Sequence, residues 1–295
     1  MNQKYKKIMM PDGFSSVNPP PTKDELHNFY AKTYYQDPKS HTYQKAYTDI
    51  ELSYKKLKCE ALIWLLNKYI YNNEKSFIDI GAGEGFLLNA AYENSYEITG
   101  LDFSNFGISK FFPHLLPKFL AGDLFQSLSE LIDKNKRFNF CVSTNVLEHV
   151  LEPNLFLQSL KKVLLPGGVV AITVPNDYSD IQNLALQEKF IDKDFWFLPP
   201  EHLHYFNSEN LVKFLQRNGF NLIDAFSDFP IDIFLLHSGS NYAINPENGN
   251  QANQARMLHD IMIINKYGFN KYLEYYRAMF NIGLGRNITV ILRLN

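Results

Sequence analysis

The chain has 295 residues, of which 45% are apolar and 20% charged, and its formal net charge is −2. This is the composition of an ordinary globular protein, and it excludes a chain that is disordered throughout. A net charge so close to zero provides no field that would hold a polyanion or a membrane surface, so nucleic acid and membrane are not expected as partners.

The sequence shows no membrane or export segment. No apolar run reaches the roughly 18 residues needed to span a bilayer, and the amino end has no signal-type hydrophobic region. We therefore expect a cytoplasmic protein. Cys59 and Cys141 lie far apart and outside any Cys/His cluster, so neither a disulfide framework nor a zinc site is predicted from them.

The N-terminal region, residues 1–73, is predicted to be a lead-in followed by a helical cap. Residues 1–23 are polar and contain Pro19-Pro20-Pro21, which predicts a loose, extended lead-in. From Asp24 onward the pattern is helical, with apolar side chains recurring every three or four residues. These side chains are Tyr54, Leu57, Ala61, Leu65 and Tyr69.

Residues 74–295 change to short apolar runs separated by helix-length stretches, which is typical of a parallel α/β sheet. Strands are predicted at 76–80, 97–101, 118–121, 138–143, 169–174, 221–227 and 287–294. Helices are predicted near 85–93, 104–112, 125–134, 153–164 and 207–218, with one or two more before the last strand. A flap at 176–206 and an insertion at 230–285 interrupt the alternation. Because nothing marks a second core, these residues are predicted to form one structural domain.

A glycine-rich turn follows the first predicted strand and contains Gly81, Gly83 and Gly85. Glycine allows a ligand to approach the backbone closely, and the helix that follows offers free N–H donors. The spacing is not the dinucleotide pattern G-x-G-x-x-G, because the third glycine comes one residue early and bulky Phe86 follows it. Asp79 would repel a pyrophosphate and attract the ammonium and sulfonium groups of S-adenosylmethionine. Such turns also occur without any ligand.

Acidic residues also close the next two predicted strands. Asp102 suits the two ribose hydroxyls of a nucleoside, and Phe103 beside it is assigned to the same site. Asp123 suits the adenine amino group, while Leu124 would pack on the ring. Aspartate is a common turn residue, so each of these acids has a purely structural explanation as well.

Over roughly residues 70–228, the sequence resembles the class I S-adenosylmethionine-dependent methyltransferases. The resemblance rests on the residues above and on two further runs, Asn145-Val146-Leu147-Glu148-His149-Val150 and Leu164-Leu165-Pro166-Gly167-Gly168. The resemblance implies a Rossmann-like, doubly wound seven-stranded sheet in the order 3-2-1-4-5-7-6, with strand 7 antiparallel. It also implies S-adenosyl-L-methionine as the cofactor.

Two further segments resemble a branch of this family found in polysaccharide and nucleotide-sugar pathways. They are Pro199-Pro200-Glu201-His202-Leu203-His204-Tyr205-Phe206, which comes after Val174-Pro175-Asn176-Asp177, and the turn Gly283-Leu284-Gly285-Arg286. A sugar acceptor is what this finer resemblance implies.

Methylation of a sugar hydroxyl calls for a general base, and histidine is the usual choice. His149 follows the fourth predicted sheet strand and His202 lies in the flap, so both are candidate catalytic bases at the carboxyl ends of the strands. Each has a structural alternative, and His202 competes with His204. Glu148 could hold a substrate hydroxyl, pair with a histidine or face solvent. Asn145 is assigned to the methionine side of the cofactor.

Other candidates are weaker. Tyr34, Tyr35 and Tyr43 resemble aromatic lid residues but also suit plain packing, and Tyr178 and Trp196 could stack on a sugar or a base. No metal site is predicted, because the flap acids are expected to be solvated turn carboxylates; these are Asp177, Asp180, Asp192 and Asp194.

The sequence thus predicts an S-adenosylmethionine-dependent methyltransferase that acts on a hydroxyl of a small carbohydrate or nucleotide-sugar acceptor. Three alternatives stay open: N-methylation of an amino sugar, O-methylation of a phenol or quinone precursor, and a protein that binds the cofactor without turnover. The oligomeric state is left open.

Overall fold

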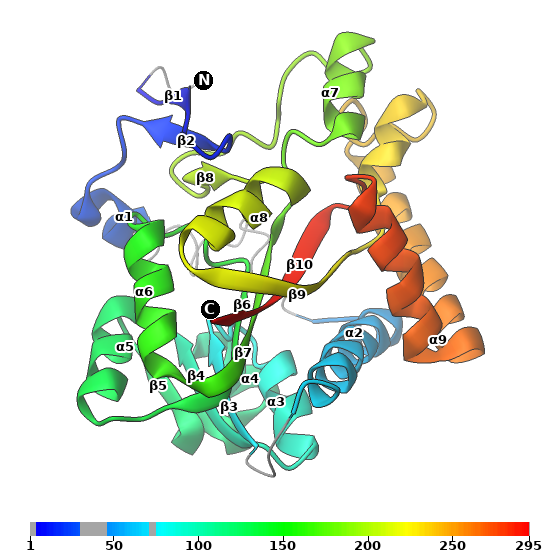
Figure 1. Ribbon diagram of the computed structural model, residues 1–295. Coiled ribbons are helices and arrows are strands. Elements are labelled where there is room, and N and C mark those ends of the chain that lie inside the picture. Colours follow the sequence, from blue (N-terminus) through cyan, green and yellow to red (C-terminus); the bar gives the residue numbers. More distant parts are fainter. Residues whose placement is uncertain (1–3, 30–45, 71–74, 295) are drawn as a thin grey trace.

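The computed structural model describes residues 4–29, 46–70 and 75–294 (Figure 1). Its centre is a seven-stranded sheet in the order β5-β4-β3-β6-β7-β10-β9. Strand β10 runs antiparallel to both of its neighbours, and the other pairs are parallel. The predicted α/β fold and strand order are confirmed. The strands are β3 Ser76–Ile80, β4 Glu97–Asp102, β5 Phe119–Ala121, β6 Phe138–Thr144, β7 Leu164–Pro175, β9 Phe220–Ser227 and β10 Asn287–Leu294.

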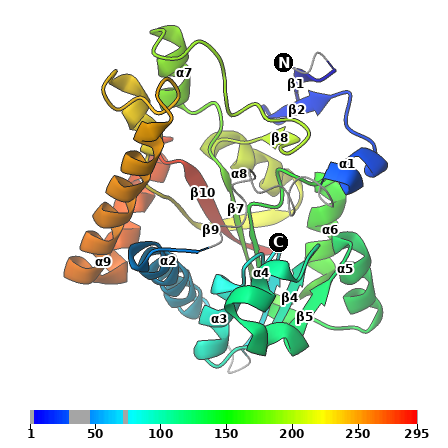
Figure 2. The same cartoon turned by 180° about the vertical axis from the view of Figure 1, so that it is seen from behind.

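Helices cover both faces of this sheet, as Figures 1 and 2 show. One apolar cluster joins the sheet to α5, α6 and α8, and a second joins the opposite face to α2, α3 and α9. Both faces of the central strands are therefore buried, and β6 is buried along almost its whole length. The bounds are α2 Asp49–Asn67, α3 Phe86–Glu93, α4 Phe106–Phe111, α5 Leu124–Asp133, α6 Pro153–Val163, α8 Ser208–Arg217 and α9 Glu247–Asn281, with short 3-10 helices η2 Pro113–Lys118 and η3 Ile231–Leu236.

Helices α2 and α9 lie side by side on one face of the sheet (Figures 1 and 2). Tyr54, Ala61 and Leu65 of the predicted stripe are buried in α2. Helix α9 occupies much of the predicted insertion at 230–285, and it is interrupted at Gly268, where φ is 76°. No helix in the described parts of the chain is both long and apolar enough to cross a membrane.

The prediction of a loose lead-in is wrong for much of residues 1–23. Strands β1 (Lys6–Met9) and β2 (Ser15–Asn18) form a small sheet with β8 (His204–Tyr205), and α1 (Lys23–Phe29) follows. Phe14 is only 2% exposed and packs against Phe206 and Phe214. A few isolated apolar anchors therefore order this segment, although they are too sparse to form a recognisable period.

The small sheet lies over the end of the molecule where the central strands finish, together with α7 (Asp180–Gln187) (Figure 1). It connects the amino end to the flap, since Ser15 pairs with Tyr205 and Ser16 with His204. The flap is thus packed against the amino-terminal strands along one edge.

Candidate functional site

The glycine turn lies between β3 and α3, and all three glycines have positive φ: 81° at Gly81, 54° at Gly83 and 83° at Gly85. A Cβ on Gly81 would lie 2.2 Å from Cγ2 of Val146, and one on Gly85 would lie 3.0 Å from Ile108. A Cβ on Gly83 would meet no atom of the described residues within 4 Å. Packing therefore requires the outer two glycines, while the middle one borders space that the described chain leaves open.

Asp102 holds the middle of this turn. Its carboxylate accepts hydrogen bonds from the backbone N–H groups of Gly83, at 2.9 Å, and Ser104, at 3.2 Å. Phe103 is half-buried next to it. Asp79 is 2% exposed, and burial, with a smaller contribution from the charge of Asp102, raises its pKa to about 7. Two acids thus lie beside the turn, one engaged with its backbone and one buried behind it.

The remaining predicted cofactor residues lie along the same edge. Asp123 is the N-cap of α5 and accepts a hydrogen bond of 2.9 Å from the Gln126 N–H, with half-buried Leu124 next to it. Asn145 is exposed, with φ of 53°. Because β3, β4, β5 and β6 pair in parallel, their carboxyl ends meet at one edge, so the structure brings these residues to the same side of the sheet.

Glu84, inside the glycine turn, was not selected from the sequence. It is 8% exposed and accepts hydrogen bonds from the Tyr47 hydroxyl, at 2.7 Å, and from Lys55 Nζ, at 3.1 Å. It therefore joins the turn to the N-terminal cap. Its position between two glycines of the turn was the feature of the sequence that could have indicated a role at this site. Tyr34, Tyr35 and Tyr43 lie outside the described residues.

These observations fit S-adenosylmethionine. The described chain leaves the space next to Gly83 open, a buried carboxyl at Asp79 favours cationic groups, and Asp102 has a carboxylate that can accept hydroxyl hydrogens. The helix that follows starts at Gly85 without a side-chain cap, so its first N–H groups also face the turn.

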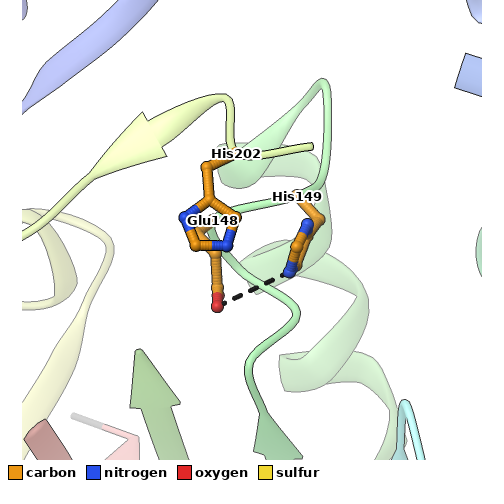
Figure 3. Close-up of side chains that lie close together, drawn as sticks. All are labelled: Glu148, His149 and His202. Carbon is orange, nitrogen blue, oxygen red and sulfur yellow. Dashed lines mark ion pairs between the residues drawn. The ribbon is translucent and has the colours of Figure 1, made fainter. Parts of the chain in front are cut away.

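A second group of side chains lies in the turn after β6 and in the flap. Figure 3 shows Glu148, His149 and His202 converging, with one potential ligand atom from each within 4.8 Å of the others. His149 Nε2 lies 3.7 Å from Glu148 Oε1. The rings of His149 and His202 are 4.8 Å apart, edge to face. Glu148 is 1% exposed, and neither of its carboxylate oxygens has a hydrogen-bond partner within the described chain.

Backbone hydrogen bonds fix this cluster by joining the flap to the turn. The Glu148 carbonyl accepts from the N–H groups of Leu203, at 2.7 Å, and His204, at 3.1 Å. In return, the Glu201 carbonyl accepts from His149 Nδ1 at 2.6 Å. Because a carbonyl can only accept, Nδ1 of His149 carries the proton and the Nε2 lone pair is directed away from the flap backbone.

Asp177 and Arg286 form the outer side of the cluster. Asp177 is 1% exposed and is not the solvated turn carboxylate that the sequence predicted. Its Oδ1 accepts from Arg286 Nη1 at 2.8 Å, and its Oδ2 lies 4.0 Å from His202 Nδ1. Asn176 donates to the carbonyls of Gly283 and Gly285, both at 2.9 Å, so the two motifs of the finer resemblance meet here.

Burial dominates the protonation of these groups. It raises the pKa of Glu148 to about 8, with the charge of Asp177 adding to the shift. It lowers the pKa of His149 to about 4 and that of His202, which is also beside His149 and Arg286, to about 3. Burial also raises the pKa of Asp177, against the influence of Arg286. Both imidazoles are therefore neutral near pH 7.

The structure separates His202 from its competitor His204. His204 is paired on both ring nitrogens, with Ser16 Oγ at 2.8 Å and the Val150 carbonyl at 2.9 Å, so it has a structural place in β8. The helix that follows, α8, is capped by Asn207. The expectation that Trp196 could stack on a ligand is wrong, because this side chain is 2% exposed and packs against Tyr178 and Phe195.

The cofactor-side and histidine-side groups adjoin one another. Ile80 pairs with Ser143 across β3 and β6, and Gly81 packs against Val146, which lies two residues before Glu148. A ligand in the glycine turn would therefore lie next to the turn that holds Glu148 and His149.

Comparisons with known proteins agree with this geometry. Residues 54–225 match the family model described as a methyltransferase domain. The ubiquinone biosynthesis O-methyltransferase of Histophilus somni is 26% identical over 155 residues, covering 47% of this chain and 65% of that protein. The enzyme of the same name from Bradyrhizobium diazoefficiens is 29% identical over 99 residues, 34% of this chain and 39% of that protein. The chain thus spans less than two thirds of the length of either relative.

Among solved structures, the 1,6-didemethyltoxoflavin-N1-methyltransferase of Burkholderia thailandensis, with 1,6-didemethyltoxoflavin and S-adenosylhomocysteine bound, is similar over 99% of both chains. Its TM-score is 0.53 and its sequence identity 14%, so the likeness concerns the fold.

Proposed function

The chain belongs to the S-adenosylmethionine-dependent methyltransferases, the family that residues 54–225 match, and we propose that it methylates a hydroxyl oxygen of a small acceptor. The observation that carries this proposal is the buried cluster of Glu148, His149 and His202 next to the glycine turn. A hydroxyl is a weak nucleophile until it loses its proton, and this cluster supplies groups that promote the loss.

The cofactor site in this proposal is the glycine turn with its acids. Asp102 accepts the ribose hydroxyl hydrogens, and Asp79 faces the cationic part of the ligand. Asp123 and Leu124 receive the adenine, Asn145 lies at the methionine side, and Phe103 completes the wall beside Asp102. S-adenosylmethionine supplies the methyl group when bound and leaves as S-adenosylhomocysteine, because the electron pair of the broken carbon–sulfur bond stays on sulfur.

The catalytic step in this proposal takes place at His202 and His149. Burial lowers the pKa of both, so each imidazole is neutral and able to interact with the acceptor hydroxyl through a lone pair. Glu148 lies where its ionisation would stabilise a positive charge on either imidazole. The flap that carries His202 also covers the cluster from one side, which helps to exclude water from the reacting atoms.

We propose a carbohydrate or nucleotide-sugar hydroxyl as the acceptor. The support is chemical: such hydroxyls are weakly acidic and need assistance, and the cluster is built around proton-accepting groups. A phenol of the quinone-precursor type is the second candidate, which the names of the O-methyltransferase relatives favour. Both acceptors use the same step, in which an oxygen forms the new bond to the methyl carbon.

The test is formation of S-adenosylhomocysteine with a panel of nucleotide sugars, free sugars, catechols and amino sugars. Replacing His202 or His149 with alanine is expected to lower turnover of hydroxyl acceptors about 10²- to 10⁴-fold, while His114→Ala, at an exposed position outside the cluster, should leave it unchanged.

The panel also separates the alternatives. If amino sugars were the only acceptors in the panel that are methylated, the methylated atom would be nitrogen and not oxygen. Tight cofactor binding with no product over the whole panel would favour a protein that holds the cofactor without turnover.

A further inference from the structure

We propose that Glu148, His149 and His202 bind a divalent transition metal ion, with Zn²⁺ as the reference ion. Whether this metal site exists does not depend on the proposed function. The role given to the ion, which is to acidify the acceptor hydroxyl, rests on the proposed function. The sequence predicted no metal site, because Glu148 and His202 come from separate segments that only the fold brings together.

The spacing of the ligand atoms suits one ion. Zinc binds histidine nitrogen and carboxylate oxygen at about 2.0 to 2.2 Å, which places two tetrahedral ligands roughly 3.4 Å apart. Glu148 Oε1 and His149 Nε2 are already 3.7 Å apart. The third ligand atom lies within 4.8 Å of the others, so small side-chain rotations complete the site.

The second observation is the state of Glu148. Both of its carboxylate oxygens are buried without a hydrogen-bond partner in the described chain. Folded proteins rarely leave a 1% exposed carboxyl in that condition, because it loses its hydration and gains nothing in return. A cation between the three side chains would compensate the carboxylate directly.

His149 has the outer hydrogen-bond partner that metal-binding imidazoles usually have, and His202 has a carboxylate near its outer nitrogen without a hydrogen bond to it. His149 Nδ1 donates to the Glu201 carbonyl at 2.6 Å, which directs its Nε2 toward Glu148. His202 Nδ1 faces Asp177 Oδ2 at 4.0 Å, and Arg286 holds that carboxylate in place. A carbonyl or carboxylate on the outer nitrogen orients the ring and leaves the other nitrogen for the ion.

The ligand set selects the class of ion. Two neutral imidazoles and one carboxylate suit zinc and similar transition ions, whereas magnesium and calcium prefer oxygen ligands only. Three protein ligands leave a coordination position for a hydroxyl of the acceptor. With the ion bound, the imidazole lone pairs are used for coordination, so the ion replaces the two histidines as the group that activates the hydroxyl. A hydroxyl so bound loses its proton to water more readily, and its oxygen bonds to the methyl carbon as the carbon–sulfur bond breaks.

Binding is measured first, without reference to activity. The full chain, prepared without a histidine tag and stripped with chelator, is titrated calorimetrically with Zn²⁺ in the presence of S-adenosylhomocysteine. We expect one ion per chain. Co²⁺ in place of Zn²⁺ should give visible absorption bands that report nitrogen and oxygen ligands.

Variants locate the site. His202→Ala and Glu148→Gln should lose the stoichiometric ion, while His114→Ala, an exposed imidazole outside the cluster, should keep it. Unchanged affinity for S-adenosylhomocysteine in each variant shows that the fold is intact. No Zn²⁺ or Co²⁺ binding by the wild type, or equal binding by His202→Ala, Glu148→Gln and the wild type, would overturn the proposal.

The two proposals fail in different ways. If the stripped protein forms S-adenosylhomocysteine at the full rate and Zn²⁺ neither binds nor stimulates it, the metal site is wrong and the methyl transfer stands. If Zn²⁺ binds at the cluster but no acceptor is methylated, the site stands and the proposed function is wrong.

Discussion

Arg286 Nη1 donates a hydrogen bond of 2.8 Å to Oδ1 of Asp177, which joins the start of the last strand to the segment that leaves β7. Asp177 is 1% exposed, and its other oxygen lies 4.0 Å from His202 Nδ1. This buried ion pair therefore fixes a carboxylate between the C-terminal turn and the flap histidine.

Replacing Arg286 with methionine should destabilise the protein, because the Asp177 charge would remain buried without compensation. We expect the free energy of unfolding to fall by about 3 to 5 kcal/mol, measured by urea denaturation. The control is Lys213→Met, which breaks a 2.6 Å pair with Glu209 on the surface and should cost no more than about 1 kcal/mol. Similar losses for both variants would contradict the importance given to the buried pair.

Asp102→Ala should weaken binding of S-adenosylhomocysteine by about 1 to 3 kcal/mol in calorimetric titrations, because hydrogen bonds to a charged acceptor would be lost. The variant also removes the acceptor of the Gly83 N–H, so part of the loss reflects a less ordered turn. Asp133→Ala, at the exposed end of α5, is the matched control and should bind normally. An unchanged affinity for Asp102→Ala would remove this residue from the ribose role.

Substitutions at two glycines should have separable effects. Gly83→Val should abolish cofactor binding, because its side chain would enter the open space beside the turn, although the φ of 54° also adds some strain. Gly81→Val should instead lower the melting temperature strongly, because its Cβ would lie 2.2 Å from Val146 Cγ2. Melting curves and calorimetry on both variants check this, and a folded Gly83→Val protein that binds tightly would refute our placement of the ligand.

Cofactor affinity should depend on pH through Asp79, whose pKa is raised to about 7 by burial and the nearby Asp102. A cationic ligand favours the ionised carboxylate, so the proton must leave before or during binding. Affinity should therefore fall by up to about tenfold from pH 8 to pH 6. Calorimetry in buffers of different ionisation enthalpy should detect the released proton. The dependence should disappear in Asp79→Asn, and its persistence there would point to another group.

The same residue predicts a dependence of stability on pH without ligand. The folded-state pKa of Asp79 lies above its ordinary value of 3.8, so its contribution is fully present below pH 4 and is lost as the pH rises through about 7. At pH 8, the free energy of unfolding of Asp79→Asn, measured by urea denaturation, should exceed that of the wild type by about 4 kcal/mol, whereas at pH 4 the two should be similar. Equal stabilities at pH 8 would show that the carboxyl is less buried than the structure indicates.

The sequence predicted the sheet well because its signals are local. The strand ending at Ile80 and the glycines after it are adjacent in the chain. The order of the strands in the sheet follows from the family resemblance. The acids that close β4 and precede α5 were found for the same reason. Glycine spacing and strand ends can be read directly, without knowledge of contacts between distant segments.

Features that depend on contacts between distant segments were missed or misjudged. Asp177 resembles a turn carboxylate until the fold places Arg286, 109 residues away, beside it. The ordering of β2 depends on its pairing with β8, and the choice between His202 and His204 depends on Ser16. Trp196 is a packing residue because the fold buries it against Tyr178 from an earlier part of the flap. None of these relationships leaves a pattern within a short window of sequence.

The pairing of β2 with β8 matters for how this protein is prepared. Ser16 holds His204, and two residues earlier in the chain lies His202. Trimming polar leading residues to improve crystals or yield would remove this support and disturb the flap segment that carries His202. If a shortened protein folds and binds the cofactor but shows no turnover, the truncation itself accounts for the loss of activity. Assays for acceptors should therefore use the protein with its amino end intact.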